Sequence, residues 1–233
     1  MRAKRSTTGL RPFEIPLLGM FKSINKVIKV LVLSDVVFLT GLGFSSPIFA
    51  IFIANNIQGG NVKIAGFAAS IYCIVLALVL IPFGKYLDRN HGERDDLYFI
   101  MIGNFLIALA VFGYIFSSLI WHIYLLQVLY AVGIGMNIPG YTAIFTRHVD
   151  KGKEAFSWSA RATFVGIGTG IAGALGGTIA LYFGFKILFA GAGIFIILSS
   201  LLPLLILKDI SPRDKKMPRI LEIKTVKPPT PKL

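Results

Sequence analysis

Residues 97–146 read LYFIMIGNFLIALAVFGYIFSSLIWHIYLLQVLYAVGIGMNIPGYTAIFT, and these 50 residues contain no Asp, Glu, Lys or Arg. An α-helix rises about 1.5 Å per residue, so roughly 20 apolar residues cross the roughly 30 Å of hydrocarbon in a bilayer. The stretch is too long for one crossing. It therefore predicts two membrane helices, 97–118 and 119–146, joined by a tight hairpin in which Trp121 lies at the membrane interface.

Four more runs have the length and apolarity of membrane helices, namely 30–53, 64–83, 162–185 and 187–207. Asp35 is the only charged residue in the six runs. With 55% hydrophobic and 15% charged residues, the composition lies outside the range of soluble domains. The predicted fold class is an all-α membrane protein with six transmembrane helices, which form one bundle over residues 30–207.

Two basic segments flank the predicted bundle. Within residues 1–29, the stretch 17–28 places apolar side chains at helical spacing with Lys and Asn opposite. This pattern indicates either an interfacial cytoplasmic helix or an extension of the first membrane helix. Residues 208–233 contain eight Lys and Arg and several prolines, which predicts a solvated cytoplasmic tail.

The distribution of Lys and Arg predicts the orientation. If the N-terminus is cytoplasmic, 22 of the 24 basic residues fall on the cytoplasmic side, and only Lys63 and Lys186 fall outside. By the positive-inside rule, both termini are then cytoplasmic. The net charge of +13 belongs to one side of a membrane rather than to a nucleic-acid-binding patch. We expect a multi-pass protein of the cell membrane that contacts the lipid bilayer and no nucleic acid.

A short internal repeat relates the first and fourth predicted helices. Residues 41–47, GLGFSSP, match residues 133–139, GIGMNIP, and Asp35 and Gln127 fall at the same offset from these motifs. Since the two helices run in opposite directions, the match predicts an inverted repeat of three plus three helices, as in many secondary transporters. Chance similarity is the alternative, because Gly and Pro are common in membrane helices.

No pattern in the sequence indicates an enzyme. The three histidines, His91, His122 and His148, fall at expected helix ends or loops without the spacing of metal ligands, and Cys73 is the only cysteine. Neither a nucleophile with its base nor a pair of carboxylates is present. We therefore expect no catalytic residue, no metal site and no cofactor.

Residues 84–94, GKYLDRNHGER, follow the second predicted helix. They resemble the cytoplasmic signature of the major facilitator superfamily, whose Gly, Asp-Arg pair, second Gly and basic residue match Gly84, Asp88, Arg89, Gly92 and Arg94. The interval from Arg89 to Gly92 is one residue longer than in the family. Three acids, Glu93, Asp95 and Asp96, dilute the usual basic cluster.

A second resemblance lies in the predicted fifth helix. Residues 168–177 are similar to the glycine-rich motif of proton-coupled exporters of this superfamily, with Gly173 at the position of the usual Pro. Small residues four apart let helix backbones approach closely, so the pattern also predicts helix packing. The residues of this helix-packing motif are Gly168, Gly173, Gly176 and Gly177.

The resemblance implies the N-terminal six-helix half of a transporter in which two such bundles rock about a central site. It further implies that the signature's acid, Asp88, holds a cytoplasmic gate by contacting the second bundle. The implied function is secondary active transport of a small solute, with proton-coupled export, by a half-transporter that pairs with another copy or half. The alternative is a truncated or split half that acts only as a membrane interaction module.

Asp35 is the candidate for proton coupling, because a carboxylate inside a membrane helix is costly and suggests a function. The alternative is that Asp35 lies near the cytoplasmic interface and pairs with Lys29 or a loop arginine. Three residues of the fourth helix, Gln127, Asn137 and Tyr141, are candidates for lining a substrate cavity, and interhelical hydrogen bonds are the alternative.

Two further polar groups have structural interpretations. Asn104 on the third helix is expected to be a packing residue, since that helix is peripheral in the family. Arg94 with Asp150 or Glu154 is expected either to form a cytoplasmic charge network or to be hydrated.

Overall fold

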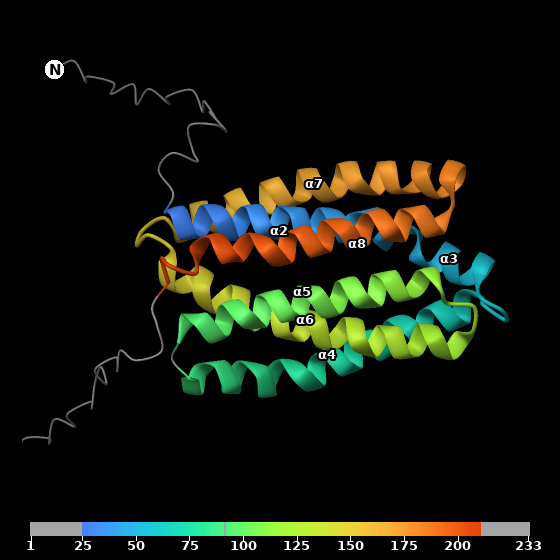
Figure 1. The fold of residues 1–233 in the computed structure, drawn as a ribbon, viewed down its shortest axis with the longest axis horizontal. Coiled ribbons are helices and arrows are strands. Elements are labelled where there is room, and N and C mark those ends of the chain that lie inside the picture. The colour runs from blue at the N-terminus through green and yellow to red at the C-terminus, as the bar shows by residue number, and fades with distance from the viewer. Residues whose placement is uncertain (1–24, 91, 211–233) are drawn as a thin grey trace, which may run out of the picture.

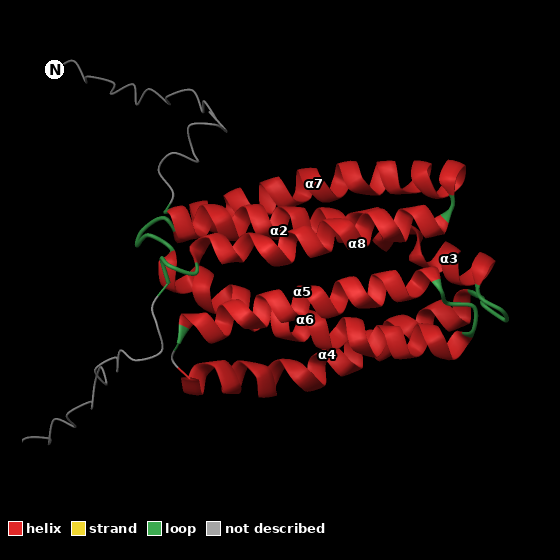
Figure 2. Cartoon of the chain, viewed as in Figure 1, coloured by secondary structure: helices red, strands yellow, loops and turns green. Residues whose placement is uncertain are grey.

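The computed structural model describes residues 25–90 and 92–210, and the regular elements of this part of the chain are helices joined by short loops (Figures 1 and 2). The elements are α2 (Lys26–Ser45), η2 (Ser46–Ile48), α3 (Phe49–Asn56), α4 (Val62–Asn90), α5 (Glu93–Ile115), α6 (Ile120–His148), α7 (Glu154–Phe183), α8 (Phe185–Leu201) and η3 (Leu202–Ile206). The segment 17–24 of the expected interfacial helix, His91 of the signature, and most of the basic tail lie outside the described residues.

Six helical segments are long and apolar enough to cross a membrane, which confirms the predicted fold class. The hairpin between the third and fourth spans is confirmed as well, since only residues 116–119 separate α5 from α6. Several helices start earlier than their apolar runs, and α7 starts eight residues before the predicted 162. Polar residues extend a helix once it has left the hydrocarbon, so hydropathy marks the membrane core rather than the helix ends.

The first span begins at Lys26, where the side chain of Asn25 accepts a hydrogen bond from the backbone N–H of Val27. Asn25 is not helical, so the span does not continue unbroken into the preceding segment. Further along, the span breaks at Ser46–Ile48, a single 3₁₀ turn that contains Pro47. The equivalent proline of the repeat, Pro139, lies inside an unbroken α6.

The helices pack in two groups of three. One group is α2, α7 and α8, the other is α4, α5 and α6, and α5 meets α8 between them (Figure 1). Each group combines the first helix of one three-helix repeat with the second and third helices of the other. The contacts α2–α7 and α2–α8 thus have the counterparts α6–α4 and α6–α5, as expected of an inverted repeat.

Glycine allows the closest of these contacts. On α5 and α6, Gly103 and Gly133 face each other so closely that a Cβ on either would meet the other's carbonyl oxygen. At the end of the bundle that includes α3, rings from α3, α5 and α8 form a cluster. Its members are Phe49, Phe52, Tyr114, Phe185 and Phe189.

Two helices present most of their apolar surface outward. In the most apolar window of α4 only 6% of the residues are buried, and in that of α7 11%, against 33–44% in the other four spans. These faces therefore contact either lipid or another membrane protein.

Candidate functional site

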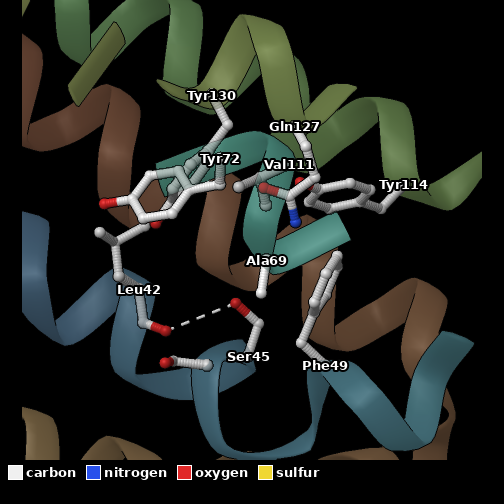
Figure 3. A pocket seen from close by; sticks show the side chains of 10 residues that line it. Leu42, Ser45, Phe49, Ala69, Tyr72, Val111, Tyr114, Gln127 and Tyr130 are labelled. Atoms are coloured by element: carbon white, nitrogen blue, oxygen red, sulfur yellow. Dashed lines mark hydrogen bonds between the residues drawn. The ribbon is translucent and has the colours of Figure 1, made fainter. Parts of the chain in front are cut away.

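A pocket of about 310 Å³ lies inside the bundle, next to the break in the first span (Figure 3). It is lined from five helices and the 3₁₀ turn, by Leu42, Ser45, Ser46, Phe49, Ala69, Tyr72, Val111, Tyr114, Gln127 and Tyr130. None of these ten lining residues in the described part of the chain is charged.

The break in the first span shapes one wall of this pocket. The hydroxyl of Ser45 donates to the carbonyl of Leu42 at 3.4 Å, a bond that closes the last turn of α2. The 3₁₀ turn then redirects the chain, so that the ring of Phe49 at the start of α3 stands at the pocket (Figure 3). Residues 42, 45, 46 and 49 would share one face of a straight α-helix as well, so the turn changes the direction of the chain at the pocket rather than which residues face it.

The pocket lies well inside the apolar part of the bundle. Gln127 is seven residues past the start of α6 at Ile120, and Tyr72 is ten residues past the start of α4 at Val62. At about 1.5 Å per residue, these residues lie roughly 10 and 15 Å from the α3 end of the bundle. Hydrocarbon is about 30 Å thick, so the pocket reaches the middle third of the membrane.

Gln127 is the one amide of the pocket. The residue is only 7% exposed, and its side chain has no hydrogen-bond partner within residues 25–90 and 92–210. Figure 3 shows its amide directed into the space between Tyr72 and Phe49. The amide is accessible from the pocket, so it offers a hydrogen-bond donor and an acceptor to whatever occupies the cavity.

Aromatic rings surround this amide. The rings of Tyr72 and Tyr130 meet edge to face with centroids 5.5 Å apart, and those of Phe49 and Tyr114 are 5.0 Å apart. These are the ring separations of attractive aromatic pairs, so the walls hold one another in place.

Asp35, the proton-coupling candidate, lies outside this pocket and is buried in an ion pair. Its carboxylate lies 2.7 Å from the guanidinium of Arg161 on α7. The guanidinium also lies over two rings, with its carbon 5.0 Å from the centroid of Tyr141 and 5.6 Å from that of Trp158. Arg161 belongs to a helix rather than to a loop, because α7 begins at Glu154.

The other two cavity candidates on α6 do not line the pocket with Gln127. The side-chain amide of Asn137 donates to the side-chain oxygen of Asn104 on α5 at 2.7 Å, and Tyr141 packs against Phe145 and Arg161. Asn137 and Tyr141 follow Gln127 by 10 and 14 residues, which places them about 15 and 21 Å further along α6.

Asn137 belongs to a polar network that joins four helices. Asn104 donates from its amide nitrogen to the hydroxyl of Ser199 on α8 at 3.2 Å, and Ser34 of α2 donates to the carbonyl of Ser199 at 2.9 Å. All four residues are buried. The network therefore stabilises the contact between the two groups of three helices.

The signature segment lies where α4 ends and α5 begins. Asp88, Arg89 and Arg94 are exposed, and Asp88 has no ion-pair partner in the parts of the chain that the structure describes. Gly92 is the N-cap of α5 in an extended conformation, and Gly84 has open space where a Cβ would stand.

The acids after the signature have partners that the sequence did not reveal. Asp96 pairs with Arg147, and Glu93 lies 3.6 Å from His148, so the start of α5 is joined to the end of α6. The sequence did contain a signal for this pairing. Three acids lie in the first turn of α5, and two basic residues lie in the last turn of α6. Neither Asp150 nor Glu154 forms an ion pair with Arg94 in the described residues, and Arg94 is exposed, as in the hydrated alternative; Asp150 lies 3.7 Å from Lys153.

The glycine motif of α7 divides between two faces. A Cβ on Gly168 would meet Thr40, one on Gly173 would meet Pro47, and one on Gly176 would meet the backbone of Phe44, all on the first span. Gly177 has open space at this position. Three of the four motif residues therefore allow α7 to pack on the first span, and the fourth faces elsewhere.

Comparison with known proteins agrees with the architecture. A family model described as the Major Facilitator Superfamily matches residues 33–229. A relative from Lactococcus lactis subsp. lactis (strain IL1403), named "Multi-drug resistance efflux pump PmrA homolog", is 28% identical over 169 residues. The match covers 71% of this chain and 40% of the relative, so the chain spans less than half of that protein's length.

Proposed function

The chain belongs to the major facilitator superfamily, and from this premise we propose that it forms one six-helix half of a secondary active transporter that exports a small solute in exchange for protons. Transport rather than catalysis is the chemistry of this superfamily. The relative that shares 28% of its aligned residues with this chain is named as an efflux pump, which supports export as the direction.

The observation that carries the proposal is the pocket around Gln127. It combines an amide that has no partner in the described residues with a helix break, at a depth of roughly 10–15 Å from the α3 end of the bundle. Transporters place their substrate sites near the midplane and at interrupted helices, where a rocking bundle opens them to either side in turn. A packing defect would not need an amide directed into it.

The exposed faces of α4 and α7 support pairing with a second bundle. Their apolar residues are largely uncovered, and small residues such as Gly166 and Gly170 have open space around them. A second copy of the chain, or a separate six-helix half, would cover these faces. The exposed Asp88 would then contact that second bundle at the gate, on the side of the membrane that we propose is cytoplasmic.

Asp35 and Arg161 support proton coupling. A proton on the Asp35 carboxylate removes its charge and weakens the ion pair, which loosens α2 from α7, while the guanidinium of Arg161 stays charged and keeps its contacts with the rings of Tyr141 and Trp158. The pair thus gives the first and fifth spans two arrangements that differ by one proton.

A membrane interaction module without transport is the second candidate, favoured by the short span of the chain relative to the efflux pump. Two measurements separate the candidates. The mass of the protein, extracted with its lipids into polymer nanodiscs, is expected to show a second copy or a partner half. Strictly monomeric protein without a partner would contradict the half-transporter.

The second measurement uses everted membrane vesicles, acidified inside, and two probe solutes, the cation ethidium and the uncharged isoquinolin-1(2H)-one. We expect at least one of them to release protons from the vesicles, and this release to be lost in Asp35→Asn. Transport by this variant with its proton dependence intact would rule out Asp35 as the coupling residue.

A further inference from the structure

The pocket around Gln127 also carries information about what it binds. We propose that it takes an uncharged, planar heteroaromatic group whose edge offers a hydrogen-bond donor next to an acceptor, as in a cyclic amide. This inference rests on the proposed function, because it names the substrate class of the same pocket.

The walls of the pocket favour a flat ring. Figure 3 shows the rings of Tyr72, Phe49 and Tyr114 around the cavity, with the amide of Gln127 directed into it. A ligand ring placed there has aromatic neighbours, and each aromatic pair adds to the affinity beyond simple area burial. At about 310 Å³ the cavity is at the lower limit of ordinary ligand sites, so it has room for a small ligand such as a fused bicyclic ring.

The absence of charge around the pocket disfavours an ionic ligand. Its ten lining residues in the described part of the chain are apolar, aromatic, hydroxyl or amide side chains. A bound cation would lose its hydration without a counter-charge, which is costly in a low-dielectric site. The nearest acid on the same helix, Asp35, is ten residues before Ser45, about 15 Å away along α2, and already pairs with Arg161.

The polar edge of the ligand follows from Gln127. A carboxamide has an oxygen that accepts and a nitrogen that donates, and neither has a partner within residues 25–90 and 92–210. A cyclic amide pairs with both through two parallel hydrogen bonds. Sites built to hydrogen-bond a ligand reject analogues that lack the matching group, because the buried protein group is then left unpaired.

A binding experiment tests this inference on the full 233-residue chain, held with its native lipids and any partner in polymer nanodiscs. The probe is tritiated isoquinolin-1(2H)-one, an uncharged bicyclic lactam. Two competitors keep the ring size: 2-methylisoquinolin-1-one, which lacks the donor, and N-methylisoquinolinium, which is a cation. We expect the lactam to bind about tenfold more tightly than either competitor.

Two substitutions locate the effect. Gln127→Leu is expected to weaken lactam binding by about tenfold and to leave the affinity for the N-methyl lactam within about twofold. An unchanged affinity for the N-methyl lactam shows that the variant is folded. Gln58→Leu, which changes the exposed glutamine of the loop between α3 and α4, is the matched control and should bind the lactam as the parent does.

Three results would overturn the inference: no saturable lactam binding, preference for the cation, or undiminished lactam binding by Gln127→Leu. Proton-driven ethidium transport without lactam binding would likewise refute the inference and leave the transport proposal standing. Lactam binding that depends on Gln127, in a protein that transports nothing, would support the inference and contradict the transport proposal.

Discussion

The carboxylate of Asp35 on α2 lies 2.7 Å from the guanidinium of Arg161 on α7, and only 4% of the Asp35 side chain is exposed. The pair joins the first and fifth spans of the bundle. Tyr141 of α6 and Trp158 of α7 place their rings beside the guanidinium, so three helices meet at one charge. Because the charges compensate each other inside the bundle, removing one partner is more harmful than removing both.

A double-mutant cycle tests this relationship. We expect Arg161→Gln to lower the free energy of unfolding by about 2–3 kcal/mol, because it leaves the Asp35 carboxylate buried without a counter-charge. Arg161 is 25% exposed, which keeps this value below that of a fully buried pair. The double variant with Asp35→Asn should be more stable than the sum of the single effects by about 1–3 kcal/mol. Unfolding is measured by SDS titration in lipid micelles.

The chain offers a matched control pair for this cycle. Lys26 and Asp209 also lie 2.8 Å apart, but their side chains are 67% and 37% exposed. The same cycle on this exposed pair should give a coupling near zero, because water screens both charges. Equal couplings for the two pairs would show that burial adds nothing to the Asp35–Arg161 contact.

The second prediction concerns the amide network between the two groups of helices. Asn104→Leu leaves the amide of Asn137 and the hydroxyl of Ser199 without their side-chain partner. We expect a loss of about 1–3 kcal/mol in the free energy of unfolding, measured by the same titration. Asn55→Leu, at an exposed position of α3, is the control and should have little effect. A neutral Asn104→Leu would mean that the network does not stabilise the contact.

The third prediction compares two adjacent glycines of α7. A Cβ on Gly176 would meet the backbone of Phe44, which cannot move without shifting α2, whereas Gly177 has open space. We expect Gly176→Ala to destabilise the bundle by about 1–3 kcal/mol, as overpacking does. Gly177→Ala should be neutral or stabilising by up to about 1 kcal/mol, since Ala favours a helix over Gly. Thermal unfolding of both variants in nanodiscs checks the difference, and identical melting temperatures would contradict it.

Most of the fold was predictable from the sequence, because crossing a bilayer imposes a length and an apolarity that can be read residue by residue. The hairpin at 116–119 followed from length alone. The different behaviour of Pro47 and Pro139 was not predictable. Both stand in the same short motif, but α6 stays unbroken at Pro139 and the first span breaks at Pro47. Which proline bends its helix depends on neighbouring helices that a linear pattern does not identify.

The site was predictable only in part. Gln127 was a cavity candidate as a polar residue of the fourth predicted helix, and it lines the pocket. The aromatic walls formed by Tyr72, Phe49 and Tyr114 were missed, because they come from three helices and have no common spacing. The sequence left open whether Asp35 pairs with a loop arginine. Its partner is Arg161, which lies on α7 rather than in a loop because this helix begins before its apolar run.

The last prediction concerns the signature acid Asp88. It is exposed and has no ion-pair partner in the described residues, so Asp88→Asn should leave the free energy of unfolding of this bundle within about 0.5 kcal/mol of the parent. If Asp88 holds a gate against a second bundle, the same variant should lower solute-driven proton release from everted vesicles by about tenfold, which corresponds to a coupling of about 1.4 kcal/mol. Asp209→Asn is the control for the loss of a negative charge, because it removes the exposed acid of the surface pair with Lys26. Equal transport by the parent and Asp88→Asn would show that the signature has no gating role in this chain, because the carboxylate has no contact within the described bundle through which it could otherwise act.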